Sequence, residues 1–223
     1  MELNSERNTR VCRGMVEGFF RKRWVPRFQV GEGASVFLAT TWLFFLLLGY
    51  FVIRPVRETL GSLVDSDDLK RLFLASFVTM LAAVPAYGVL VNSLPRRWLV
   101  RVVYQSFALC LVGFWVFLRS DSEIVQAWAA WILFVWISFF GVFATTVFWS
   151  VVADLFSSRQ AKRLFGFIAA GGTVGALAGS VIASQLAKLL TTEQFMLLPI
   201  VVIELGLLCA WMLEKQAAVL AEA

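Results

Sequence analysis

The feature that most constrains this chain is a run of thirty residues, 124–153, without a single charged side chain. Five further apolar stretches of comparable length occupy residues 34–60, 69–91, 98–118, 164–190 and 195–213. A helix needs about 20 predominantly apolar residues to cross the hydrocarbon core of a bilayer. The sequence therefore predicts an all-α, polytopic membrane protein with six transmembrane helices.

Composition excludes a soluble globular protein. Hydrophobic residues make up 60% of the 223 residues and charged residues only 16%, whereas globular domains average about 45–50% apolar and about 25% charged residues. The net charge of +5 is interpreted as loop charge that orients the helices in the membrane, not as a surface for nucleic acid.

Three parts are expected along the chain. Residues 1–33 form a basic arm without an apolar segment, which predicts a cytoplasmic extension and not a cleaved signal peptide. Residues 34–213 form the six-helix transmembrane domain, and residues 214–223 form a cytoplasmic tail.

The distribution of cations predicts that both termini are cytoplasmic, because lysines and arginines are enriched in cytoplasmic loops. If the six spans alternate in direction, fourteen of the 20 lysines and arginines fall on the side of the termini. The others are Arg54, Arg57, Lys70, Arg71, Arg119 and Lys188.

Local signals mark the end of the first span and the start of the second. Pro55 removes one backbone donor, and we expect the helix to continue past it and to stop near Gly61. Ser66, followed by Asp67 and Asp68, has the pattern of an N-cap with acids in the first helical turn.

Cysteine and histidine usage argues against metal chemistry. The three cysteines, Cys12, Cys110 and Cys209, are dispersed, and the chain has no histidine. We therefore expect no metal site, no cofactor and no catalytic residue.

One stretch, residues 148–180, joins two apolar spans through a polar connection at 154–163 and has the sequence FWSVVADLFSSRQAKRLFGFIAAGGTVGALAGS. Its FW-S, aspartate and Q-A-K-R-L-F-G elements resemble those of the bacterial and plastid ATP/ADP translocases, nucleotide transporters related to the major facilitator superfamily. The patch Arg54-Pro55-Val56-Arg57-Glu58 is similar to the element that ends their first helix. Arg159 departs from the pattern, which often has an acid there.

This resemblance implies a fold and an activity. The fold is the N-terminal half of a facilitator, built from two inverted repeats of three helices. The activity is exchange of nucleotides such as ATP and ADP, or of a related phosphorylated anion, by alternating access across a bacterial inner membrane. Because such carriers have about twelve spans, a homodimer or a second six-helix half is an expected partner.

Tyr50, Arg54 and Arg57 are the candidate substrate-binding residues. Their spacing of four and three places them on one helical face, and planar guanidinium groups suit phosphate oxygens. The alternative is structural, with both arginines reaching lipid headgroups or pairing with Glu58 and neighbouring acids. In the resembling carriers a functional cation stands at the position of Arg57.

Two further groups of residues have both a structural and a functional interpretation. Lys162 and Arg163 are positive-inside anchors, or partners of Asp154 in a cytoplasmic gate. Gly171, Gly175 and Gly179 recur every four residues, which favours close helix packing and, in a carrier, offers a smooth surface for two halves to move on.

Polar residues inside the spans are the remaining candidates. Glu204 is the one acid well inside a span, where an ionised carboxylate needs a partner or water. Two roles are open for the uncharged polar residues in the spans: they line a polar path, or they form hydrogen bonds between helices. These residues are Gln105, Thr145, Thr146 and Ser150. Besides a carrier of nucleotides, the sequence leaves open a carrier of another organic anion, and a non-transporting scaffold or degenerate half-carrier that binds a partner through its basic arm.

Overall fold

The structure is a computed structural model that describes residues Glu32 to Glu222. The predicted basic arm therefore lies outside the described residues, except for Glu32 and Gly33. The chain divides into two units, Met1–Gly33 and Ala34–Ala223. The second unit contains all the long helices that the structure describes, apart from the first two residues of the first one.

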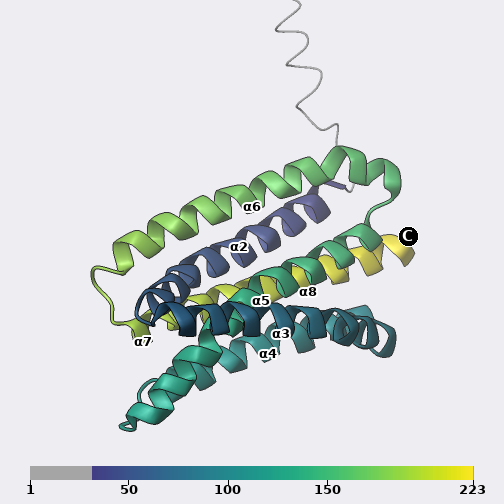
Figure 1. Cartoon of the computed structure of the whole chain (residues 1–223). Helices are drawn as coiled ribbons and strands as arrows, with labels where there is room; N and C mark the ends of the chain where they lie inside the picture. The colour runs from purple at the N-terminus through teal and green to yellow at the C-terminus, as the bar shows by residue number, and fades with distance from the viewer. Residues whose placement is uncertain (1–31, 223) are drawn as a thin grey trace, which may run out of the picture. The chain divides into compact units, whose positions relative to one another are not determined.

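The described residues are helical apart from short connections and contain no strand, which confirms the all-α prediction. Six of the helices are long and apolar enough to cross a membrane, as expected for a membrane protein. The elements, labelled in Figure 1, are α2 (Glu32–Ser62), α3 (Ser66–Ser93), α4 (Arg96–Phe117), α5 (Glu123–Leu155), α6 (Ser158–Leu186), the short α7 (Thr192–Phe195) and α8 (Leu197–Glu222).

The turn between α2 and α3 differs from the prediction by one residue. Helix α2 runs through Pro55 to Ser62, as expected. The N-cap of α3 is Asp65, whose backbone is extended, so Ser66 is the first helical residue. Asp67 and Asp68 lie in the first turn, where their charges favour the positive end of the helix dipole.

The connection expected at residues 154–163 is much shorter than predicted. Helix α5 ends at Leu155 and α6 begins at Ser158. Ser157 and Gln160 form a capping box, in which each side chain bonds the backbone N–H of the other. Arg159, Lys162 and Arg163 thus lie in the first two turns of α6, because a helix can extend beyond the hydrocarbon where its polar side chains meet water.

The last predicted span also changes at its ends. The helix is interrupted at Met196, between α7 and α8, so the final long helix starts at Leu197 and not at Phe195. Pro199 fits the first turn of α8, where a backbone N–H has no helical partner. Helix α8 continues to Glu222, so the predicted tail is helical almost to its end.

Side-chain contacts show that α2 and α5 are antiparallel. Trp42 contacts Phe148 with a centroid separation of 4.8 Å, and eight residues later Tyr50 contacts Phe140 at 6.4 Å. Helices α3 and α5 are parallel, since Phe73 contacts Phe134 and Tyr87 contacts Phe143. Both directions agree with successive helices that cross a membrane in alternation.

Aromatic side chains form the core where α2, α4 and α5 meet. Phe107 of α4 lies against four rings of α5, those of Trp136, Phe139, Phe140 and Phe143. Tyr104 is fully buried beside them and donates its hydroxyl to the backbone oxygen of Ala144 at 3.0 Å. A buried hydroxyl is thereby satisfied.

The glycine stripe of α6 faces α2 of the same chain, and these two helices run side by side in Figure 1. A Cβ atom on Gly175 would meet the backbone oxygen of Phe44, and one on Gly179 would lie 2.6 Å from the backbone oxygen of Leu48. Gly171 lies similarly against Thr40. The prediction that the stripe allows close helix packing is therefore confirmed, and because α2 occupies the stripe, it is not a free surface for a second half.

Candidate functional site

The candidate substrate residues lie on the last four turns of α2. Tyr50 and Arg57 both face α5, seven residues apart. The Tyr50 ring occupies the space above Gly141, where no side chain fits beside it. The Arg57 guanidinium lies over the ring of Phe134 at 4.7 Å.

Arg57 is largely enclosed by apolar side chains. Its side chain is 17% exposed, and its guanidinium also lies 5.6 Å from the Phe73 ring of α3. The Nε–H of Arg57 is buried and has no hydrogen-bond partner among the described residues. An enclosed guanidinium with an unused donor is a group that an anion would stabilise.

Arg54 and Arg57 share one carboxylate. Glu58 Oε1 lies 3.7 Å from Arg54 Nε and 3.6 Å from Arg57 Nη1. Because one negative charge faces two positive charges, the group keeps a net positive charge. Glu58 is exposed, so solvent weakens both ion pairs. The structural alternative is thus observed in part: both arginines pair with Glu58, but their charge is not fully neutralised.

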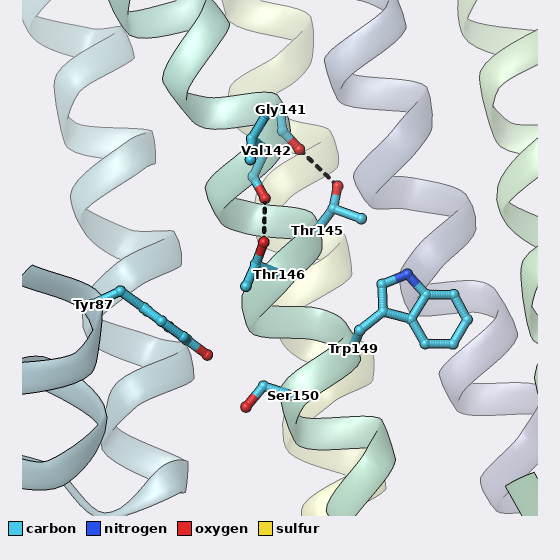
Figure 2. Close-up of a pocket in the computed structure, with 7 residues that line it drawn as sticks. All are labelled: Tyr87, Gly141, Val142, Thr145, Thr146, Trp149 and Ser150. Carbon is cyan, nitrogen blue, oxygen red and sulfur yellow. Dashed lines mark hydrogen bonds between the residues drawn. The ribbon is translucent and has the colours of Figure 1, made fainter. Parts of the chain in front are cut away.

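A hollow of about 690 Å³ lies beside α5, and Figure 2 shows the side chains around it. Tyr87 of α3 extends toward Thr146 and Ser150 of α5, while Trp149 projects away from it. The lining residues are Tyr87, Gly141, Val142, Thr145, Thr146, Trp149 and Ser150.

The hydroxyl groups in this hollow differ in their hydrogen bonding. Thr145 donates to the backbone oxygen of Gly141 at 2.7 Å, and Thr146 donates to that of Val142 at 2.8 Å. The two threonines therefore bond their own helix and not a neighbouring one. The Tyr87 hydroxyl is buried and has no partner within the described part of the chain.

Tyr87 was missed in the sequence, although it carries a signal. It is one of only three tyrosines, and a buried tyrosine hydroxyl usually has a polar neighbour. Which neighbour it meets depends on how α3 packs on α5, a contact that the sequence pattern does not specify.

The arginines and the hollow are separate features joined by one face of α5. Arg54 and Arg57 do not line this hollow. Phe134, which Arg57 contacts, lies on the same face of α5 as Gly141 and Thr145. At about 1.5 Å per residue, Phe134 and Thr145 are separated by about 16 Å along α5. Tyr50 connects the two, since it packs on Gly141 at the edge of the hollow.

The predicted gate residues lie at the other end of α5. Asp154 is in its last turn, and Lys162 and Arg163 are in the second turn of α6; all three are exposed. The short connection between these helices brings the three residues to the same end of the bundle. Their role as a gate stays a prediction.

Glu204 is exposed at the surface of α8 and accepts a hydrogen bond from Gln105 Nε2 of α4 at 3.2 Å. The two residues line a second hollow of about 690 Å³, between α4 and α8, together with Arg101. Gln105 thus bonds between helices, whereas Ser150 lines the first hollow.

Neither hollow has the side chains of a metal centre. Within residues 32–222 no group of three or more histidine, cysteine, aspartate or glutamate side chains that could hold a metal ion is found. No protein family, curated protein or solved structure matches the chain.

Proposed function

We propose that the chain is a six-helix half of a membrane carrier that exchanges nucleotides such as ATP and ADP, or a related phosphorylated organic anion. The observation that carries this proposal is the environment of Arg57. Its guanidinium is largely buried against two aromatic rings, has an unused donor and shares its carboxylate with Arg54.

The proposed architecture is the facilitator half with two inverted three-helix repeats. Exchanging the first three long helices with the last three, α2 with α5, α3 with α6 and α4 with α8, maps the α3–α5 contact onto α6–α2. It maps the α4–α8 contact onto itself. The α3–α5, α2–α6 and α4–α8 contacts all exist, and this correspondence supports a repeat.

Phosphate is the proposed recognition group, because a guanidinium presents paired N–H donors that match phosphate oxygens. A phosphate group bound to Arg57 would replace the weak ion pair between Arg57 and exposed Glu58. It would also accept a hydrogen bond from the buried Nε–H. The hydroxyl-lined hollow then lies on the path along α5 toward Asp154, Lys162 and Arg163 at the other end of the helix.

Orientation and location belong to the same proposal. Fourteen of 20 cations fall on the side of the termini, which favours cytoplasmic termini, and the resemblance to bacterial carriers is the reason to propose a bacterial inner membrane. A second six-helix unit would complete the cavity.

The test is uptake of labelled ATP by vesicles from cells that express the chain. Arg57→Ala is expected to lower the initial rate at least tenfold, and Arg57→Lys severalfold, since lysine keeps the charge but loses the planar donors. Arg71→Ala is the matched control, because Arg71 is an exposed arginine paired with Asp68 at the neighbouring start of α3. We expect it to leave uptake unchanged.

Different results would favour the other candidate functions. Uptake that unlabelled nucleotides do not inhibit, but another organic anion does, would indicate a carrier with a different cargo. No uptake, or uptake that Arg57→Ala leaves intact, would contradict the phosphate site and favour a membrane scaffold.

A further inference from the structure

The groove between α4 and α8 contains polar groups near the middle of two membrane-spanning segments. Gln105 and Glu204 are each the eighth residue of a 20-residue span, Trp98–Phe117 and Leu197–Gln216. Each Cα atom thus lies about 4 Å from the middle of its span. The groove is lined by Trp98, Arg101, Val102, Gln105, Glu204, Leu207, Leu208 and Trp211.

This groove differs from the other exposed faces of the helices. Apolar side chains such as Phe77 on α3 and Leu177 on α6 are exposed by 63% and 64%, and lipid chains cover such surfaces without any protein partner. Lipid chains offer neither hydrogen bonds nor counter-charges to Glu204, so a carboxylate there requires a polar partner.

The bond between Gln105 and Glu204 leaves several polar groups unused. It is the single hydrogen bond that these side chains make within the described region, and it uses one amide N–H and one carboxylate oxygen. A second amide N–H, the amide oxygen and the other carboxylate oxygen remain. Arg101 lies in the same groove with its guanidinium 5.7 Å from the Trp98 ring.

We propose that a second copy of this chain docks along the α4–α8 groove, with Gln105 of each copy donating to Glu204 of the other. The unused groups are self-complementary, since they include both a donor and acceptors. A two-fold axis along the membrane normal keeps corresponding residues at equal depth, so each amide can meet the other carboxylate. Hydrogen bonds of this kind stabilise contacts between transmembrane helices.

Arg101 fits the same arrangement. It lies one helical turn from Gln105, so its long side chain can extend toward the carboxylate of the other copy. A bound phospholipid would place its phosphate at the membrane surface, about 15 Å from the bilayer centre, and would leave the second carboxylate oxygen of Glu204 without a partner. A second copy therefore satisfies groups that lipid does not reach.

The experiment is cross-linking in membranes, with Cys12, Cys110 and Cys209 first replaced by alanine. Leu208→Cys places a thiol in the groove, at a site that is 49% exposed. Phe77→Cys and Leu177→Cys are matched controls on α3 and α6. With a short bis-maleimide we expect at least tenfold more linked dimer from Leu208→Cys than from either control.

Two further variants test whether Gln105 and Glu204 cause the association. Adding Glu204→Leu to Leu208→Cys is expected to reduce the dimer at least tenfold. Exchanging the two residues, Gln105→Glu with Glu204→Gln, keeps one amide and one carboxylate at the site and is expected to restore it. The exchange also shows whether loss in the leucine variant is due to misfolding.

Three outcomes would overturn the proposal. They are a Leu208→Cys yield equal to the controls, a yield that Glu204→Leu leaves unchanged, and a thiol at residue 208 that links to a different polypeptide. The readout is independent of ATP uptake, so this proposal and the carrier proposal succeed or fail separately.

Discussion

Helices α2 and α6 pack by a different means from helices α4 and α8. In the first pair, glycines bring one backbone against the other, and a Cβ atom on Gly175 or Gly179 would meet backbone oxygen. In the second pair, larger side chains leave an open groove with Gln105 and Glu204 in it. The small residues are thus used inside the chain, whereas unused polar groups mark the surface for a partner.

The strongest way to break this comparison is to add a side chain at the α2–α6 contact. Gly175→Leu would press against the backbone of Phe44, which cannot move away as a flexible side chain can. We expect loss of accumulation, or an apparent Tm lower by about 10 °C or more in detergent.

The control is Gly166→Leu on the same helix, where a Cβ atom would have no neighbour within 4 Å. We expect it to unfold within about 2 °C of the unmodified chain. Equal melting temperatures for the two variants would show that the close α2–α6 contact is not needed for stability.

A smaller effect, of opposite sign, is expected at Gly206 of α8. A Cβ atom there would lie 3.5 Å from Trp42 Cδ1 and 3.7 Å from Phe45 Cβ, which is ordinary van der Waals contact. Gly206→Ala should therefore raise the apparent Tm by about 2 °C, because alanine favours the helix by roughly 0.5–1 kcal/mol over glycine. The comparison is with Gly175→Ala, measured in parallel. If Gly206→Ala lowered the Tm as much as Gly175→Ala does, the distinction between the two glycines would be contradicted.

The smallest effect on stability is expected at Glu204. Glu204→Leu removes an interhelical hydrogen bond worth about 0.6 kcal/mol, but it also removes a carboxylate from an exposed site in the span. We expect the apparent Tm of the detergent-solubilised monomer to change by less than about 2 °C. A large loss would mean that this bond holds α4 and α8 together, and would weaken the assignment of the groove to an external partner.

Much of the helical organisation was predictable from local sequence. The six spans and the passage of α2 through Pro55 follow from apolar runs and charge positions. The start of α6 was misplaced because Arg159, Lys162 and Arg163 were assigned to a loop. The capping box of Ser157 and Gln160 was present in the sequence, and helical structure need not end where hydrocarbon ends.

The candidate site was predictable in part. The spacing of Tyr50, Arg54 and Arg57 indicated a shared face; Arg54 is exposed, whereas Tyr50 and Arg57 do face α5. Their enclosure by Gly141, Phe134 and Phe73 was not predictable, since these residues belong to other helices. Tyr87 entered the site for the same reason, through the packing of α3 on α5.

The sequence by itself determined which segments are long and apolar enough to cross a bilayer, because transfer into hydrocarbon depends on about 20 contiguous residues. Only the tertiary structure decided which helix occupies the glycine stripe, that Arg57 lies against two aromatic rings and that Glu204 is exposed. The physical reason is that the environment of a helix face is made by side chains distant in sequence, so one apolar span encloses a charge while another leaves it at the surface.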